Sequence, residues 1–310
     1  MNGLKKLGVE NMEYVLVVAG EESGDVLGER VVRKVLEKGY GAIGTGGWRM
    51  QAAGLKPVAD FEDMAVNGFF DVLKKIRRLF FIKKDLRKEL KNEKCKALIC
   101  IDYPGMNLPL MKLAKKINKS VFYVVPPKIW AWKKHRGKHF KDVNVGVFFN
   151  FEKEIYEKFG AKATVIRHPC FLNTKICEEF KDKVLFLPGS RLPQIKRNLP
   201  KYIKLASKCE NAVFVAPRKE ILDFLNKKLK GKFPVVLKPS DCSFAGAAAA
   251  FCMPGTVALE TYIAGVPTTA IAVVDPVTYI IGKLLLRTKY LTLPNILLQR
   301  EAVKEKIIFW

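Results

Sequence analysis

Residues 14–25 read YVLVVAGEESGD, a short apolar run that passes into a loop containing glycine. Residues 26–36 follow with apolar side chains at helical spacing. Apolar runs at residues 97–101 and 184–187 also end in turn residues and are followed by helical patterns. Short apolar strands that alternate with helices are typical of a parallel sheet with helices on both faces. The sequence therefore predicts an α/β fold.

The alternation pauses once, around residues 164–182, and then restarts. A chain of 310 residues is long enough for two domains. We therefore expect two Rossmann-like domains facing across a cleft, residues 1–166 and residues 167–310, with the last helical segment as a candidate to cross back. In open α/β sheets ligands bind beyond the carboxyl ends of the strands, so the loops after the strands should carry the chemistry.

Charge is the unusual property of the composition. The chain has 55 Lys and Arg against 30 Asp and Glu, a net charge of +25. Such an excess predicts an anionic partner: nucleic acid, a phosphorylated substrate or an acidic membrane. Most of the cations are Lys, which suits bidentate recognition of phosphate or bases less well than Arg. The charge alone therefore does not select among these partners.

The seven cysteines are scattered, without a CxxC pair, and the three histidines are not spaced with them as zinc ligands. We expect no metal and no cofactor. Most of the cysteines lie in apolar contexts, which suits buried free thiols in a reducing compartment. No signal-peptide core and no apolar run of about 18 residues is present, so we expect a soluble or peripheral, cytoplasmic protein.

Two glycine turns are candidate anion sites. Residues 188–191 (PGSR) lie between a predicted strand and a predicted helix, where free N–H groups and an Arg suit phosphate. Residues 254–260 (PGTVALE) repeat the arrangement, and Glu260 can accept hydrogen bonds from a ribose diol. Each stretch also fits an ordinary strand-to-helix turn.

Asp102 lies at the end of a predicted strand, where a carboxylate can act as general base toward a hydroxyl. An Asp before Tyr-Pro-Gly also fits a turn residue or a helix cap. Residues 20–25 (GEESGD) match neither GxxxxGK[ST] nor GxGxxG, and Ser23 fits a helix cap. The three histidines form no triad that the sequence reveals, and we assign them to solvent or to capping.

Residues 69–90 combine an apolar stripe with many Lys and Arg, the pattern of a basic amphipathic helix. One interpretation is a helix that packs on the sheet with solvated cations. The other is an interfacial element whose Phe side chains enter a bilayer. On that second interpretation, the candidate membrane contacts are Phe69, Phe70, Lys74, Lys75, Phe80, Lys83 and Lys84.

Nine motifs, in one order, carry a resemblance to a known family: GEESGD, GTGGWRMQAAG, DYPGMN, WAW, FEKEIYEKFG, RHP, LPGSR, PGTVALETYIAGVP and LTLPNILLQRE. From about residue 15 to about residue 303 the chain resembles lipid-A-disaccharide synthase. The resemblance implies a metal-independent, inverting glycosyltransferase of the GT-B fold. It implies that UDP-2,3-diacylglucosamine is joined to 2,3-diacylglucosamine 1-phosphate (lipid X), giving lipid A disaccharide 1-phosphate and UDP. It further implies a homodimer, no nucleic acid, and a peripheral position on the anionic inner face of the inner membrane.

By matching motif, the resemblance implies that Asp102 is the catalytic aspartate and that Arg191 lies near the donor phosphates. The implied substrate-binding residues are Gly189, Ser190, Arg191, Gly255, Thr256, Glu260 and Asn295. The chain departs from the family pattern at five places and ends soon after the last motif, which bears on acyl-chain selectivity, dimerisation and activity. The departing residues are Trp48, Gly105, Arg167, Pro254 and the pair Ala272 and Val273.

Two alternatives remain at this point. A UDP-sugar 2-epimerase would share the architecture but would need further acid/base carboxylates and histidines, for which no clear pattern appears. A basic nucleic-acid-binding protein would use the Lys field, but the sequence has no RNP motif, zinc finger or evident recognition helix.

Overall fold

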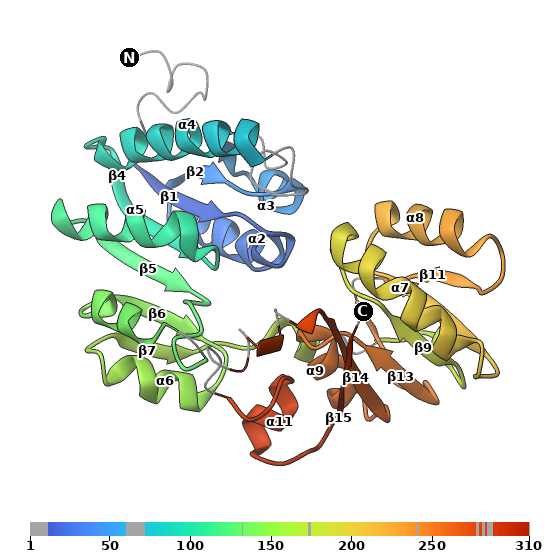
Figure 1. The fold of residues 1–310 in the computed structure, drawn as a ribbon. Helices are drawn as coiled ribbons and strands as arrows, with labels where there is room; N and C mark the ends of the chain where they lie inside the picture. The colour runs from blue at the N-terminus through green and yellow to red at the C-terminus, as the bar shows by residue number, and fades with distance from the viewer. Residues whose placement is uncertain are drawn as a thin grey trace. The chain divides into compact units, whose positions relative to one another are not determined.

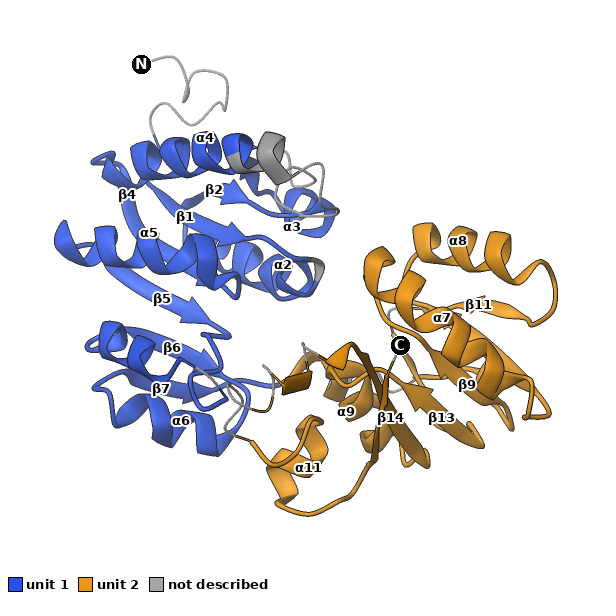
Figure 2. Ribbon diagram, viewed as in Figure 1, with its two compact units in different colours: residues 1–167 blue, residues 168–310 orange. Residues whose placement is uncertain are grey.

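The computed structural model describes residues 12–59, 72–131, 133–172, 175–239, 241–276, 279–280, 283 and 288–309. The chain divides into two compact units, an N-terminal unit of residues 1–167 and a C-terminal unit of residues 168–310 (Figure 2). Each unit is built on its own parallel sheet, so the predicted α/β fold with two Rossmann-like domains is confirmed.

The N-terminal unit contains a seven-stranded parallel sheet in the order β3-β2-β1-β4-β5-β6-β7 (Figure 1). The strands are β1 (Tyr14–Ala19), β2 (Gly41–Thr45), β3 (Lys56–Pro57), β4 (Cys95–Ile101), β5 (Ser120–Val124), β6 (Asn144–Val147) and β7 (Lys162–Val165). The helices are α2 (Glu22–Glu37), α3 (Trp48–Ala52), α4 (Val72–Lys91), α5 (Pro104–Lys116), the 3₁₀ helix η2 (Lys134–Phe140) and α6 (Asn150–Glu157).

Strand β1 shows why this sheet is covered on both faces. All six of its residues are buried. Because side chains alternate along a strand, Leu16 packs in a core with α4 and α5, whereas Val17 packs in a second core with α2 and α3. The strand order reverses between β1 and β4, so the loops after these two strands lie at the switch point of the sheet.

The C-terminal unit contains a six-stranded parallel sheet in the order β11-β10-β9-β13-β14-β15, and a small parallel pair formed by β8 and β12. The strands are β8 (Lys175–Ile176), β9 (Val184–Leu187), β10 (Ala212–Ala216), β11 (Val235–Leu237), β12 (Cys242–Ser243), β13 (Ala249–Cys252), β14 (Thr268–Val274) and β15 (Lys304–Phe309). The helices are η3 (Pro169–Leu172), η4 (Glu178–Phe180), α7 (Leu192–Ala206), α8 (Lys219–Leu229), α9 (Thr256–Ile263) and α11 (Leu293–Leu298).

Strand β9 has the same central role in this second sheet. Leu185 and Leu187 belong to a core shared with η4 and α9, and Phe186 belongs to the opposite core with α7 and α8. Phe186 stacks on Phe214 of β10 and on Phe251 of β13, with ring centroids 5.4 and 5.1 Å apart. Here the strand order reverses between β9 and β13, which defines the second switch point.

Cys177 and Cys242 form a disulfide across 65 residues of sequence. Pairing of β8 with β12 brings their Cα atoms to 5.9 Å, so two cysteines distant in the chain become neighbours. The expectation of free thiols is therefore wrong for this pair, although the other five cysteines are free and four of them are buried. Within the described residues, no helix combines the length and the apolar character that crossing a bilayer requires.

Candidate functional site

Asp102 follows β4 directly, at the switch point of the N-terminal sheet, and is partly buried. Asp102 and Tyr103 both have φ near 46°, in the left-handed region that residues other than glycine rarely adopt. Two donors hold this turn: Asn107 Nδ2 and the Tyr123 hydroxyl each lie 2.8 Å from the Asp102 carbonyl oxygen. Burial raises the pKa of Tyr123 well above its usual value, so the hydroxyl remains a donor. The strand end therefore presents Asp102 on a fixed backbone.

Asn107, in the first turns of α5, connects the two strands of the switch point. It is fully buried, and its Nδ2 lies 3.1 Å from the carbonyl oxygen of Val18 in β1 and 3.3 Å from that of Ile101 in β4. Asn107 was not among the residues predicted from the sequence. The available signal was a polar amide among the apolar positions of a helix that follows a strand.

The GEESGD and GTGG motifs are in direct contact and stabilise the same part of the N-terminal unit. Asp25 is buried and accepts hydrogen bonds from the backbone N–H groups of Arg49 and Met50, so it caps α3. A Cβ at Gly47 would lie 2.6 Å from Asp25 Oδ2, which explains the glycine. The expectation for Ser23 is wrong, because α2 begins at Glu22 and Ser23 is an exposed residue inside that helix. The acidic GEESGD motif therefore supports the N-terminal fold.

The two predicted anion loops lie together at the switch point of the C-terminal sheet. Leu187 of β9 pairs with Cys252 of β13, and the PGSR and PGT loops follow these strands directly. Asn198 of α7 is buried and bridges the loops, with Nδ2 2.9 Å from the Pro188 carbonyl oxygen and 2.8 Å from Met253 Sδ. Asn198 was not among the residues predicted from the sequence. Two loops that begin 66 residues apart in the sequence thus form one surface.

The shared surface of these loops is accessible to a ligand. The side chains or backbone of Ser190, Arg191, Gly255 and Thr256 are exposed, and α7 and α9 begin there. Helix N-termini carry free N–H groups and partial positive charge that favour phosphate. Arg218, which was not predicted from the sequence, adds a second guanidinium beside the PGSR loop. Its Nη1 donates to the Ser190 carbonyl oxygen at 2.9 Å.

The two loop glycines have different reasons to be glycine. Gly189 has φ near 131°, and a Cβ there would lie 2.6 Å from Gln194 Oε1, so the fold itself requires glycine. Gly255 is extended, and a Cβ there would meet nothing within 4 Å. The backbone at Gly255 therefore borders open space rather than protein.

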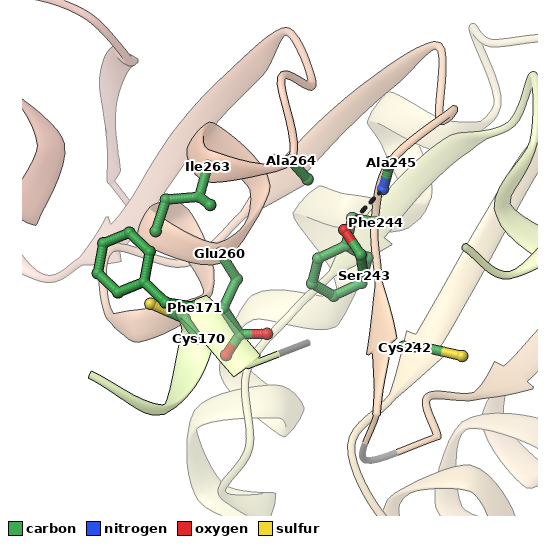
Figure 3. Close-up of a pocket in the computed structure, with 9 residues that line it drawn as sticks. All are labelled: Cys170, Phe171, Cys242, Ser243, Phe244, Ala245, Glu260, Ile263 and Ala264. Atoms are coloured by element: carbon green, nitrogen blue, oxygen red, sulfur yellow. Dashed lines mark hydrogen bonds between the residues drawn. The ribbon is translucent and has the colours of Figure 1, made fainter. Parts of the chain in front are cut away.

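Glu260, one turn into α9, reaches into a pocket of about 230 Å³ within the C-terminal unit (Figure 3). Its Oε2 lies 3.3 Å from Lys238 Nζ, and both side chains are largely withdrawn from solvent. Burial raises the pKa of Cys170 to about 12, and the negative charge of Glu260 adds to this effect, so this thiol stays protonated. The pocket is lined by Cys170, Phe171, Cys242, Ser243, Phe244, Ala245, Glu260, Ile263 and Ala264.

Asn295 of α11 has a different environment from the other predicted binding residues. It is fully buried; Nδ2 donates to the Val303 carbonyl and to Glu305 Oε1, and Oδ1 accepts from the N–H groups of Ala302 and Val303. These four bonds use the whole capacity of the amide. These bonds hold α11 to the segment that contains β15.

Helix α4 contains five of the seven predicted membrane contacts. Leu86 and Leu90 are buried against the sheet, while Phe80 and Phe81 are 65% and 48% exposed. Lys84 is exposed and Lys83 partly buried. Phe69 and Phe70 lie outside the described residues, and Lys74 and Lys75 lie in α4 with side chains that the structure does not describe.

Solved structures of other proteins share this fold. Over 84% of this chain and 79% of its own, the structure of a putative UDP-N-acetylglucosamine 2-epimerase from Listeria monocytogenes superposes with a TM-score of 0.58 at 12% identity. The structure of CalG4, the calicheamicin glycosyltransferase, gives 0.51 at 16% identity over 84% of this chain and 79% of that one. At such identities the likeness concerns the fold alone, and it places the chain in the GT-B class.

The family follows from sequence. The family described as lipid-A-disaccharide synthetase matches residues 15–309. The lipid-A-disaccharide synthase of Coxiella burnetii is 31% identical over 94% of this chain and 86% of its own length, and that of Syntrophus aciditrophicus is 32% identical over 96% and 84%. This chain belongs to the lipid-A-disaccharide synthase family of glycosyltransferases, as its motifs predicted.

The structure also bears on metal binding. Within the described ranges, no three His, Cys, Asp or Glu side chains gather as the ligands of a metal ion would. The buried His168 instead accepts a hydrogen bond from the Cys170 N–H at Nδ1, 3.1 Å away, which is a capping role for the start of η3.

Proposed function

We propose that this protein joins UDP-2,3-diacylglucosamine to 2,3-diacylglucosamine 1-phosphate with inversion at the anomeric carbon. The observation that carries the proposal is the pairing of the PGSR and PGT loops at the β9/β13 switch point, together with membership of the family. Two exposed helix starts and Arg191 suit the diphosphate of a nucleotide sugar.

The donor half of the reaction takes place at the C-terminal unit. The N–H groups at the starts of α7 and α9 and the Arg191 guanidinium bind the diphosphate. Negative charge grows on UDP as the glycosidic bond breaks, so these groups stabilise the transition state more than the ground state. Glu260 accepts hydrogen bonds from the ribose diol.

The acceptor half assigns one proton transfer to Asp102. As the acceptor oxygen forms its bond to the anomeric carbon, its proton passes to the Asp102 carboxylate and the bond to UDP breaks with its electron pair on the phosphate oxygen. A single displacement inverts the anomeric centre. The fixed backbone of Asp102, with Asn107 and Tyr123 on its carbonyl, supports the assignment.

Helix α4 brings the enzyme to its lipid substrates. The exposed Phe80 and Phe81 lie beside Arg77 and Lys84, a combination of apolar and cationic side chains that suits an anionic membrane surface. We infer that this surface is the inner face of the inner membrane.

The test is turnover in detergent. Purified protein is incubated with UDP-2,3-diacylglucosamine and 2,3-diacylglucosamine 1-phosphate, and the release of UDP is measured together with the anomeric configuration of the disaccharide. We expect equimolar UDP and disaccharide with an inverted centre. Conversion of a UDP-sugar into its 2-epimer without acceptor, or a retained centre, would contradict the proposal.

A further inference from the structure

Lys238 occupies a defined place beside the nucleotide pocket. It follows β11 directly, and its N–H donates to the carbonyl oxygen of Ala216 at the end of β10, 2.9 Å away. Its ammonium lies 3.3 Å from Glu260 Oε2 and 5.1 Å from the centroid of the Phe244 ring. The lysine thus connects the edge of the sheet with α9 and with the wall of the pocket.

This ion pair differs from the surface pairs of the same unit. The side chains of Lys238 and Glu260 are 14% and 22% exposed, whereas those of Lys175 and Asp241 are 68% and 64% exposed. Exposed pairs hold their partners weakly because water screens the charges and both side chains stay mobile. A shielded ammonium that also rests on an aromatic ring restricts the carboxylate to one orientation.

The ion pair brings Oε2 of Glu260 to 3.3 Å from Lys238 Nζ, and Glu260 is among the residues that line the pocket. The pocket volume of about 230 Å³ is below the usual size of a site for a whole small-molecule ligand. Such a volume suits one fragment of a nucleotide, with Oε1 as an acceptor inside it.

We propose that Lys238 is a positioning residue, which holds Glu260 so that Oε1 accepts a hydrogen bond from the ribose diol and thereby makes the site selective for ribonucleotides. This inference rests on the proposed function. A carboxylate that rotates freely would need to be ordered on each binding event, and the fixed ion pair removes that cost before the ligand arrives.

The test compares UDP with 2′,3′-dideoxyuridine diphosphate, which keeps the base and both phosphates. Binding of each is measured by calorimetry to the full chain and to Lys238→Met, Lys238→Arg and the exposed-pair control Lys175→Met. A hydrogen bond to a charged group predicts a preference of roughly 10- to 100-fold for UDP in the parent. We expect Lys238→Met to lose most of that preference with unchanged affinity for the dideoxy compound. Lys238→Arg and Lys175→Met should keep it.

A double-mutant cycle with Glu260→Gln distinguishes an effect of Lys238 that acts through Glu260 from a general loss of folding. If Lys238 acts through Glu260, the Lys238→Met change has little further effect on the UDP preference in the Glu260→Gln background. An unchanged preference in Lys238→Met overturns the inference. Equal weakening of both nucleotides also overturns it, because Lys238 would then bind the phosphates directly.

Nucleotide binding by the unmutated chain distinguishes failure of this inference from failure of the proposed function. A parent chain that binds both nucleotides equally well overturns the ribose assignment and leaves the phosphate loops as proposed. A parent chain that binds neither nucleotide overturns the proposed function as well.

Discussion

Asp102, to which the proposed mechanism assigns the proton transfer, has a backbone conformation that residues other than glycine rarely adopt. Asp102 and Tyr103 are both left-handed, and a Cβ at Gly20 would lie 2.4 Å from the Tyr103 ring. Such backbone costs on the order of 1–3 kcal/mol per residue and persists only where surrounding contacts determine it. The contacts are present here, since Asn107 and Tyr123 both donate to the Asp102 carbonyl.

Asp102→Asn tests the proton transfer with little change of shape. Asn tolerates left-handed backbone, so the fold should persist. General-base assistance is worth about 10²- to 10⁴-fold, and we expect kcat to fall by that factor while UDP affinity is kept. Asp142 also has positive φ and is exposed, which makes Asp142→Asn the matched control. Near-parent turnover in Asp102→Asn would exclude the base assignment.

Arg191→Ala tests the contact with the diphosphate. We expect weaker UDP binding and slower turnover, because a cation at the leaving group helps the transition state most. Arg191→Lys should restore activity only in part, since an ammonium lacks the bidentate fork. Arg300→Ala, also in the C-terminal unit, serves as control. Parent-like kinetics in Arg191→Ala would assign Arg191 to the solvated surface.

The two loop glycines give a paired prediction. Gly189→Ala should lower the unfolding temperature, because its φ is left-handed and Gln194 occupies the space of the methyl group. Gly255→Ala should leave that temperature unchanged, because its backbone is extended, yet weaken UDP binding by filling space meant for phosphate. Differential scanning fluorimetry and calorimetry measure the two effects. Parent-like UDP affinity in Gly255→Ala would remove this loop from the donor site.

At the scale of an element, α4 divides its apolar side chains between two environments. Ile82, Leu86 and Leu90 are buried at helical spacing, as expected of a helix that packs on a sheet. Phe80 and Phe81 point away from that stripe, in edge-to-face contact with ring centroids 6.0 Å apart. Packing therefore explains the leucines but not the two phenylalanines.

The membrane prediction changes four lysines of α4. Lysines 74, 75, 83 and 84 are replaced with Gln, and binding to anionic vesicles is measured by flotation. Each Lys near such a surface contributes about 1 kcal/mol, so we expect clear loss of binding at low salt and slower turnover on vesicle-borne substrate. Turnover in detergent should change little, and raised salt should reduce the difference, because ions screen the charges.

Helix α8 and the residue that follows it offer a control of equal charge, with exposed lysines at 219, 227, 228 and 230. Their replacement with Gln should affect vesicle binding less. Equal vesicle binding by the parent and the α4 variant would mean that α4 only packs against the sheet.

At the scale of the molecule, each unit has its own sheet and its own pair of cores. The C-terminal unit buries one core under η4 and α9 and the other under α7 and α8, with three aromatic rings stacked across the sheet. Both anion loops and the Glu260 pocket belong to this unit. The groups that the proposed function assigns to UDP therefore lie in a compact unit with cores of its own, and such a unit can in principle fold alone.

We therefore expect residues 168–310, expressed alone, to unfold cooperatively and to bind UDP within about tenfold of the affinity of the full chain, since this unit supplies the phosphate loops and Glu260. Thermal unfolding and calorimetry measure both properties. Residues 1–167 serve as control and should show no UDP binding. A folded C-terminal unit that does not bind UDP would mean that the N-terminal unit supplies essential donor contacts.

Local patterns were sufficient to predict the architecture. Alternation of apolar strands with helices is a short-range property, so the parallel sheets could be derived from the order of residues, as could the glycine turns after β9 and β13. Candidate site residues such as Asp102 and Arg191 were found because strand ends carry the chemistry in this class of fold. The family itself was readable from nine motifs in register.

Contacts between distant segments were decided only by the tertiary structure. Asn107 and Asn198 form hydrogen bonds to strands and loops that are far from them in the sequence. Asn295, in contrast, uses all its hydrogen-bonding groups on residues close to it in the sequence. The pairing of Lys238 with Glu260 likewise depends on the tertiary fold, which brings the residue after β11 to a side chain of α9. Hydrogen bonds and ion pairs of this kind act over a few ångströms, and packing alone selects which residues come that close. The sequence by itself determined the elements and the loops; the tertiary structure determined which polar groups meet.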